Sequence, residues 1–223
     1  MERDPMGDTM QDPGAFDQRF SNRAQAERYR DRYKTGRRAE TDQLERAALR
    51  ELLGGIGRVA VAMDLPSGTG RLSPVLAETA DRVILADSSP AMLDVAREDH
   101  RDLPADYLQT DAQNVKLSDR SVDLVFCHRF LHHIDSASLR ASILGELARV
   151  TRRYVLLSYY PPGWRSRWRW FIRSALGRVR PIDQLATMEQ FFQETSAAGL
   201  RPVRRIPMRR FRATGVFCLF ERA

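Results

Sequence analysis

The fold class is decided by the stretch DLPSGTG, Asp64–Gly70. It overlaps the end of an apolar, β-branched run at residues 58–65, which predicts a buried strand. Gly68 and Gly70 allow the backbone to turn tightly and to approach a ligand without a Cβ in the way. A buried strand that ends in an acid and a glycine-containing turn is typical of the first unit of a ligand-binding α/β sheet.

Beyond this turn the chain alternates between helical and strand-like patterns. Helical spacing predicts helices at residues 72–80, 89–100, 136–150 and 188–198. Apolar runs predict strands at residues 82–86, 107–109, 122–127 and 153–160, followed by a final antiparallel pair at residues 202–206 and 215–220. Strands that alternate with helices form a parallel sheet covered on both faces. We therefore expect an α/β fold: a doubly wound, mostly parallel seven-stranded sheet with an antiparallel last strand and helices on both faces.

The domain organisation follows from the same patterns. A length of 223 residues fits one domain with a sizeable core. Residues 1–20 lack periodicity and predict a flexible tail, and residues 21–55 predict an N-terminal helical cap that Gly36 divides in two. Residues 56–223 are the predicted main domain, with a basic, aromatic insertion at about residues 161–182.

Composition indicates the setting of the protein. No apolar run approaches the roughly 18 residues that a membrane span needs, and the polar start predicts no secretory signal. Cys127 and Cys218 lie in apolar runs outside any metal-type spacing. We therefore expect two buried thiols, no bound metal and a reducing, cytoplasmic location. The net charge of +7 comes almost entirely from arginine and bears on association rather than on fold.

Three consecutive predicted strands are followed by an acid: Asp64, Asp87 and Asp111. Ligands of open α/β sheets bind at the carboxyl ends of the strands. Asp87 can accept hydrogen bonds from both hydroxyls of a ribose. The order of the acids is therefore the order in which a nucleoside-containing ligand would meet them.

The turn at residues 64–70 does not suit a dinucleotide. The NAD fingerprint has a third glycine inside the following helix, where this chain has Ser73. Asp64 would also place negative charge beside a pyrophosphate. The same acid suits a ligand with an ammonium group and a sulfonium, such as S-adenosylmethionine.

Four motifs now stand in one order: DLPSGTG (residues 64–70), ADSSPAML (86–93), QTDAQNV (109–115) and SVDLVFCHRFLHHI (121–134). Together they resemble the class I, Rossmann-like methyltransferase family, particularly its small-molecule branch. The resemblance covers roughly residues 56–160. It implies that the main domain binds S-adenosylmethionine, transfers its methyl group and releases S-adenosylhomocysteine.

The resemblance also implies roles for single residues. The family's first motif, which cradles the aminoacyl part of the cofactor, matches Asp64, Gly68 and Gly70, with Pro66 and Ser67 in the same loop. Pro66 replaces the family's usual first glycine. Because proline fixes φ and lacks an N–H donor, this part of the loop must differ from the family pattern.

The later motifs place the nucleoside. Asp87 matches the acid that holds the ribose hydroxyls, and Ser88 and Met92 match neighbours of the adenine. The positions near the exocyclic amine of the adenine and near the methionine moiety are, in that order, Asp111 with Ala112 and His128.

The predicted N-terminal cap offers further candidate residues for the cofactor site. Residues 28–33, RYRDRY, resemble the helix that covers the cofactor in related enzymes. Tyr29 and Tyr33 lie one helical turn apart and therefore share a face. We expect both to border the cofactor, with a neighbouring arginine paired to its carboxylate. A solvated basic helix anchored by two tyrosines explains the pattern as well.

Methyl transfer is an in-line displacement at an activated carbon, so the protein mainly aligns two reactants. A general base helps only where the acceptor is protonated. The candidates are His128, His132 and Tyr159. Packing or helix capping is the alternative role of the histidines, and packing that of the tyrosine.

The segment Trp164–Arg173 interleaves aromatic residues and arginines. As a helix it would suit the surface of an anionic membrane or an acidic, apolar acceptor, and stacking on single-stranded nucleic acid is a weaker interpretation. A lid that packs its aromatics on the domain is the simplest alternative.

The leading hypothesis is methyl transfer to a small, apolar or anionic acceptor. The chain would then be cytoplasmic, with peripheral contact to the inner membrane face as a further hypothesis. A cofactor-binding regulatory or partner protein without catalysis is the second hypothesis, and an RNA methyltransferase the third.

Overall fold

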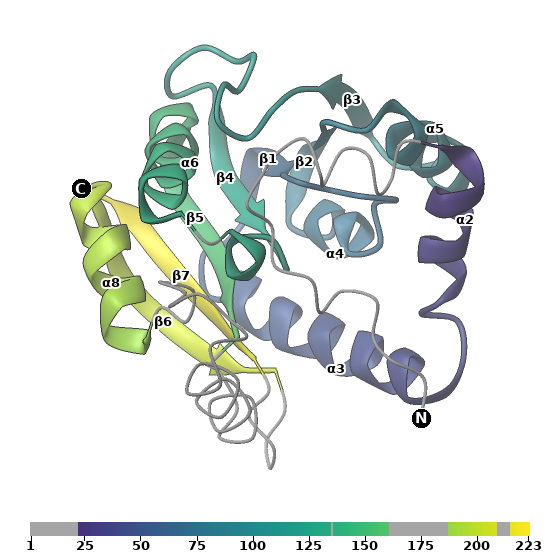
Figure 1. Cartoon of the computed structure of the whole chain (residues 1–223), viewed down its shortest axis with the longest axis horizontal. Coiled ribbons are helices and arrows are strands. Elements are labelled where there is room, and N and C mark those ends of the chain that lie inside the picture. The colour runs from purple at the N-terminus through teal and green to yellow at the C-terminus, as the bar shows by residue number, and fades with distance from the viewer. Residues whose placement is uncertain (1–21, 135, 161–186, 209–214) are drawn as a thin grey trace, which may run out of the picture.

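A seven-stranded sheet in the order β3-β2-β1-β4-β5-β7-β6 runs through the centre of the molecule (Figure 1). The structure is a computed structural model that describes residues 22–134, 136–160, 187–208 and 215–223. Its strands are β1 Val59–Asp64, β2 Ala80–Asp87, β3 Ala105–Gln109, β4 Val122–Cys127, β5 Thr151–Tyr159, β6 Leu200–Pro207 and β7 Val216–Arg222. Its helices are α2 Arg23–Asp31, α3 Gly36–Leu53, α4 Ser73–Ala77, α5 Pro90–Asp99, the 3₁₀ turn η2 Leu131–His133, α6 Ala137–Val150 and α8 Met188–Ala197.

The sheet is mostly parallel, as expected from the sequence. Strands β1 to β5 pair in parallel with one another, and β7 pairs antiparallel with both β5 and β6. The last strand is therefore the antiparallel one, and the predicted fold class is confirmed. The strand order changes direction between β1 and β4, which is where α/β sheets of this type open a crevice for ligands.

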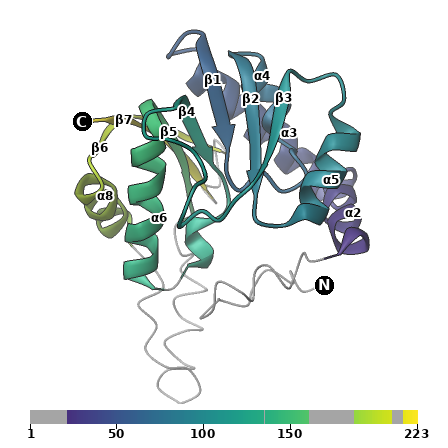
Figure 2. The ribbon, with the colours of Figure 1, turned by 90° about the horizontal axis from the view of Figure 1, so that it is seen from above.

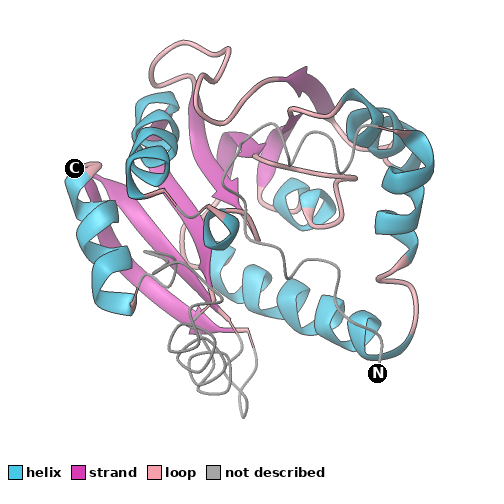
Figure 3. Cartoon of the chain, in the orientation of Figure 1, coloured by secondary structure: helices cyan, strands magenta, loops and turns pink. Residues whose placement is uncertain are grey.

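Helices cover both faces of the sheet (Figures 2 and 3). One apolar core lies under α3, α4 and α5, with Leu49 and Leu76 fully buried in it. The other lies under α6 and α8, with Ile143 and Phe191 packed on the sheet. This burial on both faces explains the near-continuous apolar character of the central strands.

Several element bounds differ from the sequence-based expectation. The helix expected at residues 72–80 is only Ser73–Ala77, and Ala80 already begins β2. Ala80 is buried and pairs with Val59, so strand pairing takes these residues from the helical pattern. Helix α5 begins at Pro90 because Ser89 caps it, accepting a hydrogen bond from the Met92 amide.

The region predicted as an N-terminal cap contains two helices, and the break between them at residues 32–35 ends at Gly36. Gly36 has φ +63°, a left-handed backbone that favours glycine. Helix α2 packs beside α5, where Arg23 makes two hydrogen bonds to Glu98 at 2.8 and 2.6 Å. The shorter helix thereby lies over the edge of the sheet that carries β2 and β3 (Figure 1).

Two predictions lie outside the described residues: the flexible tail at 1–20 and the insertion at 161–182 with its Trp164–Arg173 segment. Among the residues that the structure describes, no helix is long and apolar enough to cross a bilayer. Cys127 and Cys218 are buried free thiols, as expected.

Candidate functional site

A cavity that is partly open to solvent lies at the carboxyl ends of β1, β2 and β4. Nine of the thirteen residues expected to bind the cofactor line it: Tyr29, Asp64, Pro66, Ser67, Gly68, Asp87, Ser88, Met92 and His128. Four of the thirteen are not in its wall: Tyr33, Gly70, Asp111 and Ala112. Residues from α2 and from three strand ends therefore meet at one place, although they lie far apart in the sequence.

The loop after β1 is held in a fixed shape. Gly68 and Gly70 have φ +54° and +73°, and the Gly68 amide donates a 2.8 Å hydrogen bond to Asp87. The Ser67 amide donates to the Ala86 carbonyl at 2.8 Å. A Cβ on Gly70 would lie 2.7 Å from both Leu85 and His100, so only glycine fits there. The peptide bond before Pro66 is cis.

Asp64 ends β1 in a buried position, 3% exposed. Burial raises the pKa of its carboxyl to about 7, and the negative charge of Asp87 acts in the same direction. A 2.7 Å hydrogen bond from Ser73 and the positive charge of Arg71 oppose the rise. The carboxyl therefore changes its charge near neutral pH, at the wall of the cavity.

Asp87 ends β2 and is fixed by the backbone on both sides. Its Oδ2 accepts from the Gly68 amide, and its Oδ1 accepts from the Ser89 amide at 2.9 Å. Asp87 is thus held at the wall of the cavity by the loop after β1 and by the residue that caps α5.

The positions of the remaining expected residues vary. Asp111 is exposed, and its carboxylate accepts from the Gln113 amide at 2.7 Å. Ala112 is buried in the core under α6. Tyr33 is buried, and its ring lies 5.9 Å from that of Tyr29, which lines the cavity. The pair expected on one face of the cap is therefore together, with Tyr29 nearer the cavity.

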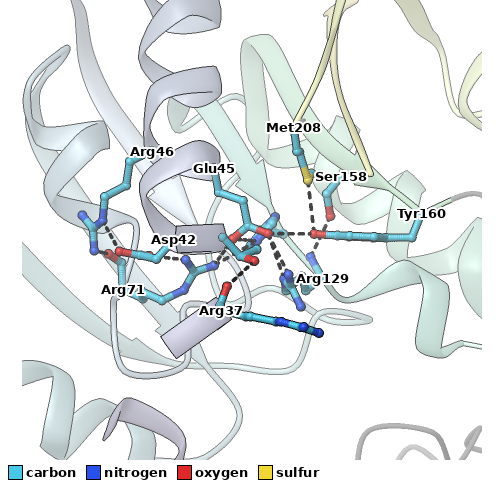
Figure 4. Close-up of polar contacts among 11 residues, drawn as sticks. Arg37, Asp42, Glu45, Arg46, Arg71, Arg129, Ser158, Tyr160 and Met208 are labelled. Atoms are coloured by element: carbon cyan, nitrogen blue, oxygen red, sulfur yellow. Dashed lines mark hydrogen bonds and ion pairs between the residues drawn. The ribbon is translucent and has the colours of Figure 1, made fainter. Parts of the chain in front are cut away.

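An unexpected charge cluster adjoins the cavity, and Figure 4 shows its polar contacts. Glu45 of α3, only 1% exposed, bridges two arginines. Its Oε2 lies 2.6 Å from Nη2 of Arg71, and its Oε1 lies 2.7 Å from Nη2 of Arg129. Arg71 and Arg129 both line the cavity. We call Glu45, Arg71 and Arg129 the arginine bridge.

The surroundings hold the arginine bridge charged. Burial alone would raise the pKa of Glu45, but hydrogen bonding to His128 and the charges of Arg129 and Arg71 hold it well below its usual range. Asp42 pairs with Arg71 as well and with Arg46 at 2.7 Å. The ring of Tyr33 lies 4.3 Å below the Arg71 guanidinium, a cation–π distance.

His128 follows β4 and has a buried side chain, 8% exposed. Its ring stacks on Phe126 at 5.7 Å, and its Nε2 lies 3.1 Å from Arg71. Burial lowers the pKa of His128 to about 4 against the opposing effect of Glu45, so the imidazole is neutral at pH 7. Its Nε2 also lies 3.4 Å from Oε2 of Glu45, so the tautomer of the ring decides whether Nε2 accepts from Arg71 or donates to Glu45.

The other two candidate bases lie outside the cavity wall. The ring of Tyr159 packs 5.0 Å from Phe191 in the core under α6 and α8. The ring of His132 lies 4.7 Å from that of Tyr160. Burial, and then the charge of the neighbouring His133, lower the pKa of His132. Tyr160, rather than Tyr159, reaches the arginine bridge, since its hydroxyl lies 3.3 Å from Glu45 (Figure 4).

The sequence contains one signal for Glu45. It precedes Ala48, Leu49 and Leu52 at helical spacing, so an acid stands on the buried face of α3. Arg71 and Arg129 are two arginines among many, and only the fold places them together. The sequence-based expectation of an arginine near Tyr29 and Tyr33 named residues of the cap, whereas Arg71 comes from the loop after β1.

Comparisons with known proteins agree with this geometry. Residues 63–157 match a family model described as a methyltransferase domain. An uncharacterized methyltransferase of Mycobacterium bovis is 36% identical over 124 residues, which are 55% of this chain and 45% of that protein. The malonyl-[acyl-carrier protein] O-methyltransferase of Pectobacterium atrosepticum is 38% identical over 91 residues, which are 40% of this chain and 34% of that protein. The chain thus spans less than half the length of these curated relatives.

The fold has solved counterparts. The magnesium protoporphyrin IX methyltransferase of Synechocystis, crystallised with S-adenosylhomocysteine, superposes with a TM-score of 0.73 and 17% identity. The match covers 95% of this chain and 100% of that one. The N-methyltransferase NodS of Bradyrhizobium japonicum superposes with a TM-score of 0.63 and 12% identity, over 82% of this chain and 97% of that one. At these identities the likeness concerns the fold.

Proposed function

We propose that this chain, which carries a class I, Rossmann-like methyltransferase domain, transfers a methyl group from S-adenosylmethionine to a small acceptor molecule. The observation that carries the proposal is the convergence of nine expected cofactor residues on one cavity. They come from α2, from α5 and from the carboxyl ends of β1, β2 and β4. No single segment of the sequence brings them together.

The donor groups of the cavity suit each part of the cofactor. Asp64 and Arg71 offer opposite charges for the ammonium and the carboxylate of its amino-acid part. Asp87 offers two acceptor oxygens for the ribose hydroxyls. Ser88 and Met92 lie beside Asp87 for the adenine. A Cβ placed on Gly68 would lie 3.5 Å from the ring of Tyr29, so the loop and this ring lie close together.

The cofactor supplies a methyl group that its sulfonium activates. The protein's own contribution is to align two reactants and to exclude water, which accounts for much of the rate of a bimolecular reaction. Tyr29, the fixed loop after β1 and the two arginines of the arginine bridge all line the cavity. His128 orients Arg71 through their 3.1 Å contact instead of removing a proton.

The test is turnover. The full-length protein is incubated with S-adenosylmethionine and acceptor mixtures, and S-adenosylhomocysteine is quantified by mass spectrometry. We expect acceptor-dependent product with the natural chain and at least a tenfold lower rate with Asp87→Asn, because a charged hydrogen-bond acceptor is worth about 1.5–3 kcal/mol. Asp81→Asn, an exposed acid of β2, is the matched control and should turn over normally.

A cofactor-binding partner protein without catalysis is the second candidate. The observation that favours it is the low basicity of His128 and His132, since neither imidazole is a strong base. Tight binding of cofactor without any S-adenosylhomocysteine formed across the acceptor mixtures would select this candidate over the first. A cytoplasmic location, a peripheral membrane contact and RNA as acceptor stay hypotheses from the sequence.

A further inference from the structure

We infer that the acceptor carries a carboxylate and that Arg129 binds it. The inference rests on the proposed function and names the substrate class for the same cavity. It is carried by three features of Arg129: its position after β4, its unusual backbone, and the way Glu45 occupies one side of its guanidinium.

The backbone of Arg129 is built to aim this side chain. Its φ is +52°, in the left-handed region that non-glycine residues rarely adopt. A 2.7 Å hydrogen bond from its amide to the Ser158 hydroxyl holds that conformation. Backbone strain of this kind clusters at ligand sites. The result is a guanidinium at the wall of the cavity, with the side chain 22% exposed.

The guanidinium of Arg129 is positioned but not saturated. Glu45 contacts its Nε at 3.3 Å and its Nη2 at 2.7 Å. The rings of Tyr160 and Tyr33 lie 5.2 and 5.9 Å from its centre. Among the described residues, none accepts a hydrogen bond from Nη1 of Arg129. A guanidinium carries five N–H donors in a planar fork, so a second carboxylate can bind along the edge formed by Nη1 and Nη2.

Glu45 is not an anchor for a cationic acceptor. Its two oxygens are engaged by Arg71, Arg129 and Tyr160, and the residue is only 1% exposed. An amine would have to displace one of these partners. The arginine bridge therefore presents positive charge to the cavity, with Arg71 assigned to the cofactor and Arg129 to the acceptor.

The chemistry of a carboxylate fits the absence of a strong base in the described site. A carboxyl group with a pKa near 4 is already ionised at neutral pH. One carboxylate oxygen forms a bond to the methyl carbon, the carbon–sulfur bond breaks, and its electron pair stays on sulfur. The products are a methyl ester and S-adenosylhomocysteine, and no proton moves. Neutral His128, whose pKa is low, is sufficient for this reaction.

The test measures binding rather than turnover. The full chain is saturated with S-adenosylhomocysteine and titrated, under ligand-observed ¹⁹F NMR, with three fluorinated pairs: a trifluoropropanoate, a trifluoromethylbenzoate and a trifluorooctanoate, each against its primary amide. The amide has the shape of the acid without its charge. We expect saturable binding of at least one carboxylate, at least tenfold tighter than its amide. If no pair shows that preference, the inference is wrong.

Variants assign the preference to Arg129. Arg129→Gln should abolish it when the variant is titrated at an S-adenosylhomocysteine concentration that saturates it. If the single variant folds poorly, the double variant E45Q/R129Q removes both partners of that pair, and Arg71 keeps its ion pair with Asp42. Arg120→Gln is the matched control, because Arg120 is exposed and also has a positive φ, +51°. It should keep the preference.

Two further outcomes separate the claims. If Arg129→Gln loses the nucleoside instead of the carboxylate preference, Arg129 belongs to the cofactor and the inference falls. If the natural chain does not bind S-adenosylhomocysteine, the proposed function itself fails.

Discussion

At the scale of single residues, the site is organised by one buried carboxylate and the two guanidinium groups that pair with it. Glu45 lies inside the protein on a helix that is otherwise apolar on that face. Arg71 and Arg129 share it across the wall of the cavity. A buried charge without its partners is costly, so each of the three side chains keeps the others in place.

Glu45→Gln tests this arrangement. The substitution leaves two guanidinium groups without their common anion, and we expect the free energy of unfolding to fall by about 2–4 kcal/mol. Urea denaturation followed by circular dichroism measures the change. Glu51→Gln on the same helix is the control: its partner Arg204 is exposed, so a change below about 0.5 kcal/mol is expected. Equal effects of the two substitutions would contradict the account.

If Asp64 binds the ammonium group of the cofactor, as we propose, the affinity for the cofactor depends on pH. Its pKa in the folded protein is raised to about 7, mainly by burial, so below that pH the carboxyl is protonated and neutral. If the ionised form pairs with the ammonium of the ligand, affinity for S-adenosylhomocysteine rises with pH through 7. Below pH 7 it should fall by up to about tenfold per pH unit.

Calorimetric titrations between pH 5.5 and 8 measure this dependence. Asp64→Asn, which cannot ionise, should bind more weakly at pH 8 and show little change with pH. A natural chain whose affinity is flat across this range would show that Asp64 does not meet the ammonium.

At the scale of elements, replacing a glycine by alanine is expected to change stability in opposite directions at the start of a helix and in its interior. Gly36 begins α3 with φ +63°, so Gly36→Ala should destabilise the protein by about 1 kcal/mol. Gly145 lies inside α6 with no atom within 4 Å of an added Cβ. Gly145→Ala should therefore stabilise by about 0.5–1 kcal/mol. Thermal unfolding of the two variants gives shifts of opposite sign, and shifts of the same sign would contradict the assignment.

The elements also mark how far the sequence alone reaches. Runs such as VDLVFC predict β4 to the residue, because a strand buried on both faces leaves a continuous apolar signal. The face that α3 buries is harder to predict from the sequence. Leu44, Ala48 and Leu52 stand four residues apart and would share one face of a helix, yet Leu44 is 42% exposed and Glu45 is buried. Tertiary contacts, which the sequence pattern does not contain, rotate the helix toward its acid.

At the scale of the whole molecule, the sequence predicts the site residues at the ends of strands. It does not predict the residues that meet through ion pairs between distant segments. Asp64 and Asp87 follow strands that the sequence reveals, and parallel pairing brings them together. Arg71 and Glu45, in contrast, meet across the covering helix and the loop after β1. No local pattern encodes that meeting. Asp111, expected beside the adenine, is exposed and outside the described cavity wall.

The most direct test of the central claim is calorimetric titration of the full chain with S-adenosylmethionine and with S-adenosylhomocysteine. The account predicts one binding site for each ligand and a clear loss of affinity in Asp87→Asn, with Asp81→Asn unchanged. The account is contradicted if neither ligand binds at roughly 1 mM. A Kd of that size corresponds to a binding free energy of about −4 kcal/mol.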